Sequence, residues 1–298
     1  MTSTPFAGRA FLCLLAGGVC IAFAPIFVRL SDTGPLASAF WRVALAVPLL
    51  WVWVLAAEKL PGSDSNSQGH DSPRNANWNL TLAGLFFAID LGVWHWSIVW
   101  TSVANATLLA NLAPIVVTLA GWLIWKRRVS RTFLVGMFVA IAGMFVLVGP
   151  NFAIGGTRLL GDALGALTAV FYASYMLAIK QARDAQASTA RLMAWSTTIS
   201  AVALLPVALI APQPFLPAAA GGWLVLAGLA IVSQVLGQGL IAYAFAHLPA
   251  SLSSVSLLIQ PVVAALAAWA IFGEAVGAAQ LVGGAIVLAG IWIAKRAS

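Results

Sequence analysis

The chain has 298 residues, of which 62% are hydrophobic and only 8% are charged, and its mean hydropathy is +0.98. A soluble domain carries about a quarter charged residues, and a soluble fold of this composition would expose far too much apolar surface to water. Soluble, disordered and nucleic-acid-binding proteins are therefore excluded. The net charge of +7 comes from basic residues between the apolar runs, where such residues orient a membrane protein.

The apolar runs are unbroken and have the length of a membrane-spanning helix, about 20 residues, without the alternation of a transmembrane barrel strand. The polar stretch between the second and third runs, Glu58–Asn79, is expected to be a flexible loop. The sequence therefore predicts an all-α, polytopic membrane protein. In chain order the ten predicted spans lie at about residues 10–30, 36–57, 80–101, 104–125, 132–149, 158–180, 190–211, 221–246, 251–272 and 277–294.

The basic residues predict the orientation of the spans. Twelve of the fifteen Lys and Arg residues fall on the side of the membrane that holds the N-terminus, and three fall on the other side. Because short loops rich in Lys and Arg stay in the cytoplasm, both termini are predicted to be cytoplasmic. The sequence contains no Walker A, HExxH or GxSxG motif and no catalytic carboxylate pair. We therefore expect neither an enzyme nor an ATP-driven pump, and neither a cofactor nor a metal site.

The sequence repeats itself at a distance of 147 residues, so that Gly92–Val148 aligns with Gly239–Lys295 without a gap. A proline, a tryptophan and two glycines shared in one register indicate a duplication. Each half has five spans, and because five is odd the second half enters the membrane from the opposite side. We therefore predict two inverted five-helix repeats, residues 1–150 and 151–298, an arrangement typical of secondary transporters with a substrate site near the midplane.

Three segments resemble one family. Asp90–Pro114 resembles the third and fourth helices of EamA-type members of the drug/metabolite transporter (DMT) superfamily, Ala250–Pro261 with Phe272–Glu274 resembles the matching end of the second EamA repeat, and Phe40–Arg42 resembles the motif that opens the second helix. The resemblance covers essentially the whole chain. It implies a ten-helix exporter of small molecules in a bacterial inner membrane, similar to the YddG-like amino-acid exporters, with spans five and ten at the periphery. Glycines in the last span fit close packing within a monomer or a homodimer contact.

Asp90 is the first candidate for substrate binding, because ionisable side chains inside a membrane are costly and mark functional sites. It lies about 13 Å into its span, near the midplane, where it can bind a substrate ammonium, carry a coupling proton or link helices by hydrogen bonds. Trp94 shares its helix face and offers a ring for stacking or cation–π contact, and His95 can titrate near neutral pH. Packing is the alternative role for Trp94 and His95.

Polar side chains in other spans complete the predicted substrate site, and interhelical hydrogen bonding or packing is their alternative role. These residues are Asn111, Tyr172, Tyr175, Gln234, Gln238 and Gln260. Amides can bind both the carboxylate and the ammonium of an amino acid. Pro114 and Pro261, equivalent in the repeat, each remove a helix hydrogen bond and are predicted to kink their helices as hinges. Arg42 can bind a carboxylate but is expected to pair with Asp32 instead.

Together these features predict a secondary transporter that exports small amphipathic molecules by alternating access. Amino acids, aromatic and hydrophobic ones above all, are the expected substrates, and the substrate gradient or protons supply the energy. The alternative is a multidrug or other metabolite exporter of the same superfamily, because an aromatic cavity accommodates drugs equally well.

Overall fold

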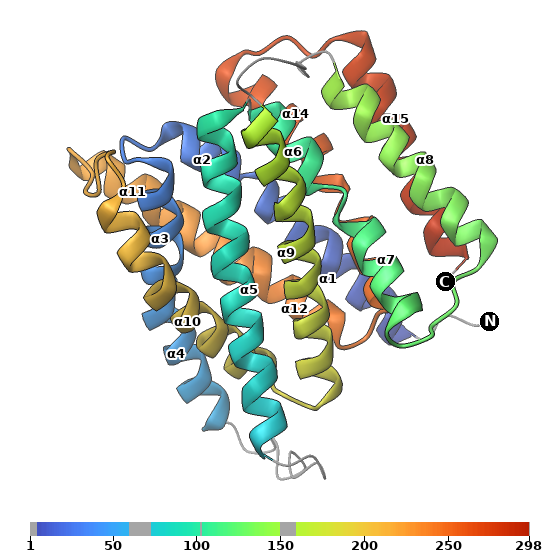
Figure 1. Ribbon diagram of the computed structural model, residues 1–298, viewed down its shortest axis with the longest axis horizontal. Coiled ribbons are helices and arrows are strands. Elements are labelled where there is room, and N and C mark those ends of the chain that lie inside the picture. The colour runs from blue at the N-terminus through green and yellow to red at the C-terminus, as the bar shows by residue number, and fades with distance from the viewer. Residues whose placement is uncertain (1–4, 60–72, 102, 150–158, 298) are drawn as a thin grey trace. The chain divides into compact units, whose positions relative to one another are not determined.

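The computed structural model describes residues 5–59, 73–101, 103–149 and 159–297, and all its regular elements in these ranges are helices (Figure 1). Ten helical stretches are long and apolar enough to cross a membrane, which confirms the all-α class and the ten predicted spans. They are Gly8–Leu30, Pro35–Glu58, Trp78–Trp100, Asn105–Leu123, Arg131–Val148, Leu159–Asp184, Thr189–Ile210, Ala220–Phe245, Ala250–Phe272 and Ala278–Arg296.

Five of the ten spans consist of two or three consecutive helical segments, and the other five are single helices. In chain order the elements are α1 (Pro5–Ala22), α2 (Ala24–Leu30), α3 (Pro35–Ala44), α4 (Ala46–Glu58), α5 (Pro73–Trp100), α6 (Val103–Ala110), α7 (Ala113–Leu123), α8 (Arg131–Val148), α9 (Leu159–Asp184), α10 (Thr189–Ile210), α11 (Ala220–Gly228), η3 (Leu229–Gln238), α12 (Gly239–Phe245), α13 (Ala250–Ser256), α14 (Ile259–Phe272) and α15 (Ala278–Arg296).

Prolines explain four of the interrupted spans. Pro25, Pro48, Pro114 and Pro261 each lie in the first turn of the second segment of their span, in α2, α4, α7 and α14. Proline lacks the N–H that would bond to the preceding turn, but it is tolerated in the first turn of a helix. The interruptions expected at Pro114 and Pro261 are therefore present, and their role as hinges stays a prediction.

Two features differ from the expectation of regular spans joined by loops. Helix α5 begins at Pro73, so the expectation of a loop up to Asn79 is wrong for residues 73–79, while residues 60–72 lie outside the described ranges. The middle of span eight, Leu229–Gln238, is a π-helix, whereas its apolar sequence predicts only a continuous α-helix. Widened turns of this kind are rare and occur frequently at functional sites.

The helices form two compact units. Unit 1 comprises Met1–Gly92 and Ser174–His247, and unit 2 comprises Val93–Ala173 and Leu248–Ser298. Unit 1 thus holds the first two spans with the seventh and eighth, and unit 2 holds the fourth and fifth with the ninth and tenth. Spans three and six, formed by α5 and α9, contribute one end to each unit. Each unit therefore takes corresponding spans from both halves of the sequence.

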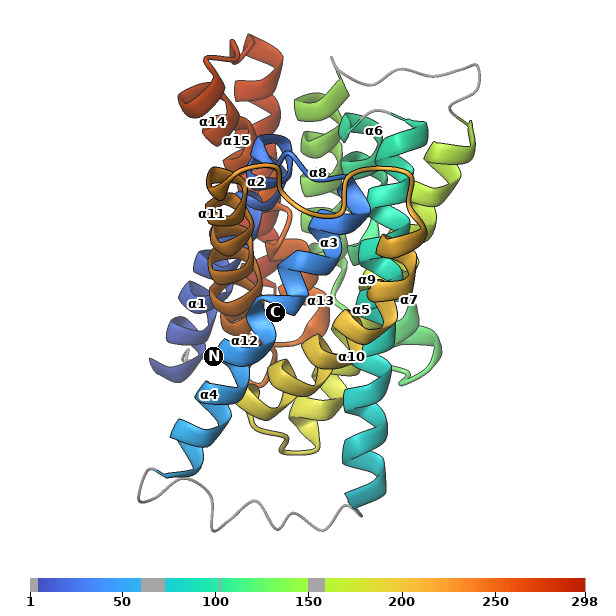
Figure 2. The same ribbon diagram turned by 90° about the vertical axis from the view of Figure 1, so that its left-hand side faces the viewer.

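In unit 1, α10 packs beside α3 and α4 (Figure 2), and α1 packs along η3 and α12. The contact of α1 with η3 is close because both helices present glycine. A Cβ atom on Gly17 would lie 2.8 Å from the carbonyl oxygen of Gly237, and a Cβ atom on Gly237 would lie 2.7 Å from Cγ1 of Ile21. Small residues at such contacts let membrane helices approach closely, where packing drives their association.

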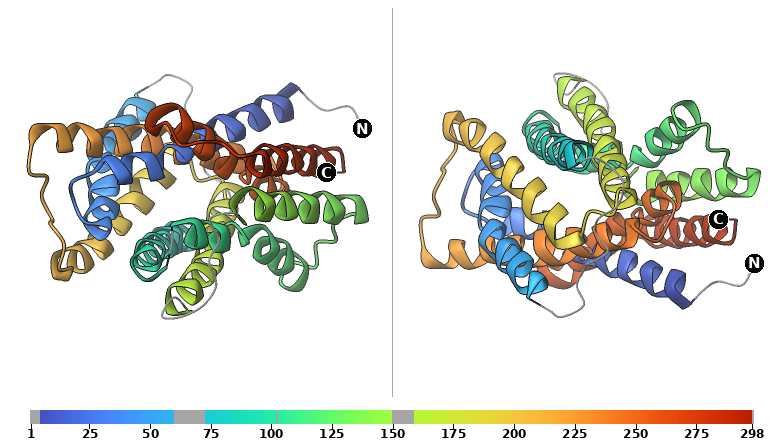
Figure 3. Two further views of the ribbon diagram at one scale, coloured as in Figure 1. Left: turned by 90° about the horizontal axis from the view of Figure 1, so that it is seen from above. Right: turned by 90° about the horizontal axis from the view of Figure 1, so that it is seen from below.

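In unit 2, α8 and α15 run side by side in opposite directions (Figures 1 and 3). Glycines of both helices form the contact. A Cβ atom on Gly143 would lie 2.5 Å from the backbone nitrogen of Val287, and one on Gly290 would lie 2.3 Å from that of Ala140. Glycines of the last span therefore serve packing within the chain.

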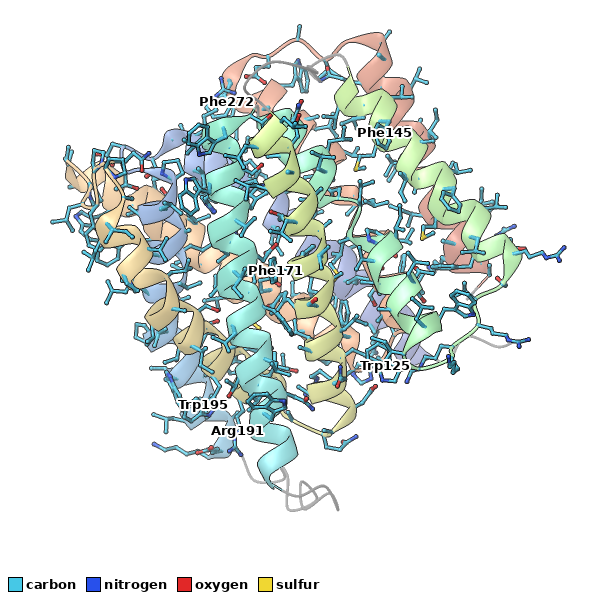
Figure 4. All side chains as sticks on the ribbon, in the orientation of Figure 1. Trp125, Phe145, Phe171, Arg191, Trp195 and Phe272 are labelled. Atoms are coloured by element: carbon cyan, nitrogen blue, oxygen red, sulfur yellow. The ribbon has the colours of Figure 1, made fainter. Side chains whose placement is uncertain are left out.

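Large apolar side chains cover the outer faces of the helices (Figure 4). Phe145 on α8 and Trp195 on α10 are examples, with 44% and 41% of their surface exposed. Exposed apolar surface on this scale is unfavourable in water, whereas lipid accepts it and requires the helical hydrogen bonding that these spans supply. The distribution of side chains thus agrees with a multi-pass membrane protein.

Candidate functional site

Seven buried side chains form a polar and aromatic group inside unit 1, contributed by α3, α5, α9, α10 and η3. We call this group the Arg42 cluster. It consists of Arg42, Phe87, Asp90, Tyr175, Thr197, Gln234 and Gln238.

The position of the Arg42 side chain is fixed by an amide. Arg42 Nε donates a hydrogen bond of 3.1 Å to Gln234 Oε1, and Gln234 Nε2 donates one of 3.1 Å to Thr197 Oγ1. The amide of Gln234 is thereby oriented with its oxygen toward the cation, which lowers the cost of burying a charge. The guanidinium carbon also lies 5.7 Å from the ring centre of Phe87, within cation–π range.

Aromatic rings continue the cluster from Arg42 to the second amide. Phe87 and Tyr175 stack with ring centres 4.5 Å apart. The hydroxyl of Tyr175 donates a hydrogen bond of 3.3 Å to Gln238 Oε1. Gln234 and Gln238 lie four residues apart on η3. The contacts that begin at Gln234 run through Arg42, Phe87 and Tyr175 and return to the same helix at Gln238.

Asp90 supplies the carboxyl group of the cluster. It lies three residues after Phe87 on α5, so both side chains point to the same side of the helix, and only 7% of its surface is exposed. The Asp90 carboxyl lies within electrostatic reach of Arg42. When both groups are charged, their attraction offsets part of the cost of burying them. Chemically, the guanidinium can bind a carboxylate, the Asp90 carboxylate can bind an ammonium, and the rings can contact an apolar group.

The expected pairing of Arg42 with Asp32 is wrong. Asp32 lies in the turn before α3, where its Oδ2 accepts a hydrogen bond of 2.8 Å from the backbone N–H of Ala218. Arg42 lies about 10 Å further along the helix axis and faces the unit interior, where Gln234 binds it. Distance along the helix therefore separates the two residues, although they are close in sequence.

The structure brings together four of the nine side chains predicted to bind substrate, namely Asp90, Tyr175, Gln234 and Gln238. Sequence reasoning missed Arg42, Phe87 and Thr197 as members of the cluster. Phe87 had a usable signal, because it precedes Asp90 by three residues on one helix. Thr197 had none, because its role depends on the position of an amide 37 residues away in the chain.

The other five predicted side chains lie in unit 2. On α5, His95 is buried and Trp94 is half-buried. Asn111 occupies the turn between α6 and α7, and its Nδ2 donates a hydrogen bond of 2.7 Å to the carbonyl of Thr107. Tyr172 is half-buried on α9. Gln260 lies on α14, and its buried Nε2 atom makes no hydrogen bond with any described residue.

A second carboxylate, which sequence reasoning missed, joins three helices of unit 2. Oδ1 of Asp162, in the first turn of α9, accepts hydrogen bonds of 2.7 Å from Thr101 Oγ1 and 2.9 Å from Asn105 Nδ2. In addition, Ser97 Oγ donates a hydrogen bond of 2.7 Å to the carbonyl of Gly161. These bonds connect α5, α6 and α9.

A buried cluster of ionisable and polar side chains within apolar spans is typical of membrane transport proteins. The family comparison agrees: the model of the EamA-like transporter family matches residues 8–149 and again residues 159–295. The chain belongs to this family, within the DMT superfamily, which confirms the resemblance. It is therefore a transporter.

Individual relatives are more distant. An uncharacterized transporter of Archaeoglobus fulgidus is 28% identical over 72% of this chain and 76% of its own. The pseudopaline exporter CntI of Pseudomonas aeruginosa is 26% identical over 70% of this chain and 72% of its own. A probable terminal-alkyne amino-acid exporter of Streptantibioticus cattleyicolor is 30% identical over 68% and 67%. One solved crystal structure superposes with a TM-score of 0.77 over 99% of this chain and 98% of its own at 19% identity, and thus shares the fold.

Proposed function

We propose that this transporter exports amino acids or closely related zwitterions across a bacterial cytoplasmic membrane by alternating access, with both termini in the cytoplasm. The observation that carries the proposal is the Arg42 cluster, which holds a guanidinium and a carboxyl group in one buried site. An α-amino acid carries the complementary pair of charges. Its carboxylate binds Arg42 and its ammonium binds Asp90.

The cluster is suited to hold such a substrate with little reorganisation. Gln234, itself bonded to Thr197, holds Nε of Arg42, so that the planar guanidinium presents a fixed orientation to a planar carboxylate. A zwitterion replaces the attraction between Arg42 and Asp90 with one contact to each, so the buried charges stay compensated. The stacked rings of Phe87 and Tyr175 favour aromatic and hydrophobic side chains.

Two relatives support the choice of substrate. One is named as a probable terminal-alkyne amino-acid exporter and the other as the pseudopaline exporter CntI. The same rings of Phe87 and Tyr175 favour a second candidate function, export of lipophilic cations, because aromatic faces also bind drug-like cations.

Alternating access requires two like halves of opposite orientation, and the contact of α8 with α15 supports this part of the proposal. Gly143 packs against Val287, and its equivalent 147 residues later, Gly290, packs against Ala140, which is the equivalent of Val287. Antiparallel helices that exchange equivalent contacts are related by a two-fold axis perpendicular to both, which lies in the membrane plane when the helices span it. Inverted repeats of this kind carry secondary transport.

The remaining predicted residues belong to the same proposal. Trp94, His95, Asn111, Tyr172 and Gln260, which all lie in unit 2, contribute to substrate passage. Protons that titrate Asp90 or His95 are the candidate coupling ions, and the interruptions at the two equivalent prolines act as hinges.

Counterflow in proteoliposomes tests the proposal. Labelled phenylalanine is followed against unlabelled phenylalanine, phenylethylamine and phenylpropionate, which keep one charge each. We expect competition by the amino acid only, and loss of counterflow in Arg42→Gln and Asp90→Asn. The matched controls, Arg191→Gln and Asp184→Asn, change charges outside the cluster and keep counterflow. Equal competition by the amine would refute the zwitterion site, and thermal stabilisation by tetraphenylphosphonium but by no amino acid would favour drug export.

A further inference from the structure

Six basic side chains gather at one end of unit 2, which we call the basic end. They are Lys126, Arg127, Arg128, Arg131, Lys295 and Arg296. Helix α8 begins there and the antiparallel α15 ends there, and Ser130 Oγ donates a hydrogen bond of 3.2 Å to the carbonyl of Ala297. The acidic residue of the α14–α15 connection, Glu274, lies at the other end of α15, about 28 Å away.

Four of the six charges at the basic end are exposed and stand apart from the described carboxylates. Lys126, Arg127, Arg128 and Arg131 are all exposed. Within the ranges that the structure describes, none of these four forms an ion pair with a carboxylate. Elsewhere Lys180, for comparison, is neutralised by Asp184 at 2.7 Å. The basic end therefore carries a strong positive potential toward its surroundings.

Lys126 has a backbone conformation that is unfavourable for a residue with a side chain. Its φ of 54° lies in the left-handed region, where it ends α7 with a hydrogen bond of 3.0 Å from Arg127 N to Gly121 O. Glycine is the usual residue in such a helix end. The equivalent position 147 residues later is indeed Gly273, with a φ of 68°. A lysine at a position that favours glycine is a candidate for a functional side chain.

Aromatic and aliphatic side chains place the basic end at the level of lipid headgroups. Trp122 and Ile124, just before the basic run, are 53% and 66% exposed, and Trp125 follows them (Figure 4). On α15, the guanidinium carbon of Arg296 lies 3.7 Å from the ring centre of Trp292. Tryptophan concentrates at the boundary between hydrocarbon and headgroups, and basic side chains extend from there to the phosphates.

We propose that the basic end binds the phosphate headgroups of anionic phospholipids, with the acyl chains against the exposed tryptophan and isoleucine side chains. Charge complementarity selects an anion, and the adjoining apolar surface selects an anion that carries hydrocarbon. Clusters of four to eight basic residues beside a membrane span are typical sites of this kind. The site stands on observations outside the Arg42 cluster and does not depend on the exported substrate.

The test uses the full chain in neutral detergent micelles doped with phosphatidylglycerol or phosphatidylcholine, with bound lipid measured by native mass spectrometry and stability by thermal unfolding. In the Arg127→Gln/Arg128→Gln/Arg131→Gln variant we expect phosphatidylglycerol to bind roughly a hundredfold more weakly, about fivefold per cation. The control variant Arg9→Gln/Lys59→Gln/Arg191→Gln removes equal charge from unit 1 and keeps the affinity.

A single substitution gives an independent measurement. Lys126→Gly removes one charge and relieves the left-handed backbone, so we expect higher stability in neutral micelles together with phosphatidylglycerol binding about fivefold weaker. The proposal is overturned if phosphatidylglycerol and phosphatidylcholine bind the unaltered chain alike, if both triple variants lose equal affinity, or if Lys126→Gly binds as the unaltered chain does. Equal stabilisation by glycerol phosphate, which has no acyl chain, would also overturn it.

Discussion

Replacing Gly290 by alanine tests how tightly α8 and α15 are packed. The new Cβ atom would lie 2.3 Å from the backbone nitrogen and 2.6 Å from the Cα of Ala140. Ordinary contacts between such atoms begin at about 3.5 Å, so the helices must separate by about 1 Å. The obstacle is backbone and not a side chain that can rotate away, so the strain spreads along the helix pair.

Overpacking of this kind costs about 1–3 kcal/mol, and the intrinsic gain of about 0.5–1 kcal/mol for Gly→Ala in a helix offsets only part of it. We therefore expect Gly290→Ala to lose about 1–2 kcal/mol, a decrease in Tm of roughly 2–3 °C. The matched control is Gly121→Ala on α7, where a Cβ atom meets nothing within 4 Å and a small rise in Tm is expected.

The assay is thermal unfolding of purified protein in one detergent, monitored by loss of the monodisperse peak in size-exclusion chromatography. Gly143 is the equivalent of Gly290 in the repeat. Gly143→Ala places a Cβ atom 2.5 Å from the nitrogen of Val287, so it should lower stability by a similar amount. A Gly290→Ala protein as stable as Gly121→Ala would refute the close backbone contact. A large effect at one glycine and none at its equivalent would refute the symmetry of the pair.

Three further predictions concern single contacts. Trp41→Phe removes the hydrogen bond of 2.8 Å from Nε1 to the carbonyl of Phe215 and should lower stability by about 1 kcal/mol, visible as a lower Tm, and an unchanged Tm would contradict it. Asp162→Ala leaves the donors of Thr101 and Asn105 without their acceptor and should cost about 2 kcal/mol, whereas Asp162→Asn, which keeps an acceptor oxygen, should cost less; equal losses of Tm would contradict this. Burial, together with the charges of Arg183 and Lys180, lowers the pKa of His247 below its ordinary value of 6.5. The unfolded chain therefore binds a proton at this histidine more readily than the folded chain does. The stability of the protein should then fall as the pH drops below about 6.5. Tm measured against pH should fall less steeply in His247→Gln, and identical slopes would exclude this contribution.

The number and position of the spans followed from the sequence because each span must satisfy its own backbone in lipid. Apolar length alone therefore located all ten. The helix interruptions at Pro114 and Pro261 followed for the same local reason, the missing N–H of proline. The start of α5 at Pro73 did not follow, because residues 73–79 are polar and helix formation there does not depend on lipid contact.

The site was harder to predict because its bonds join distant parts of the chain. Asp90 was found since a carboxylate in an apolar span is conspicuous by itself. The partner of Arg42 was missed because Asp32 is ten residues away in sequence, whereas Gln234, which binds it, is 192 residues away. The π-helix that carries Gln234 and Gln238 leaves no mark in an apolar sequence, because hydrophobicity does not distinguish α from π turns.

The repeat allows the two halves to be compared position by position, and the differences carry as much information as the matches. Gly143 and Gly290 are both retained where α8 and α15 touch, since either side chain would separate the pair. Lys126 and Gly273 share one left-handed backbone conformation but not one residue type. Each pair shares one backbone geometry, so the difference in residue type between Lys126 and Gly273 reflects the different surroundings of the two positions. If the halves are inverted, as we propose, these equivalent helix ends face opposite sides of the membrane, and a lysine on one side with a glycine on the other agrees with that asymmetry.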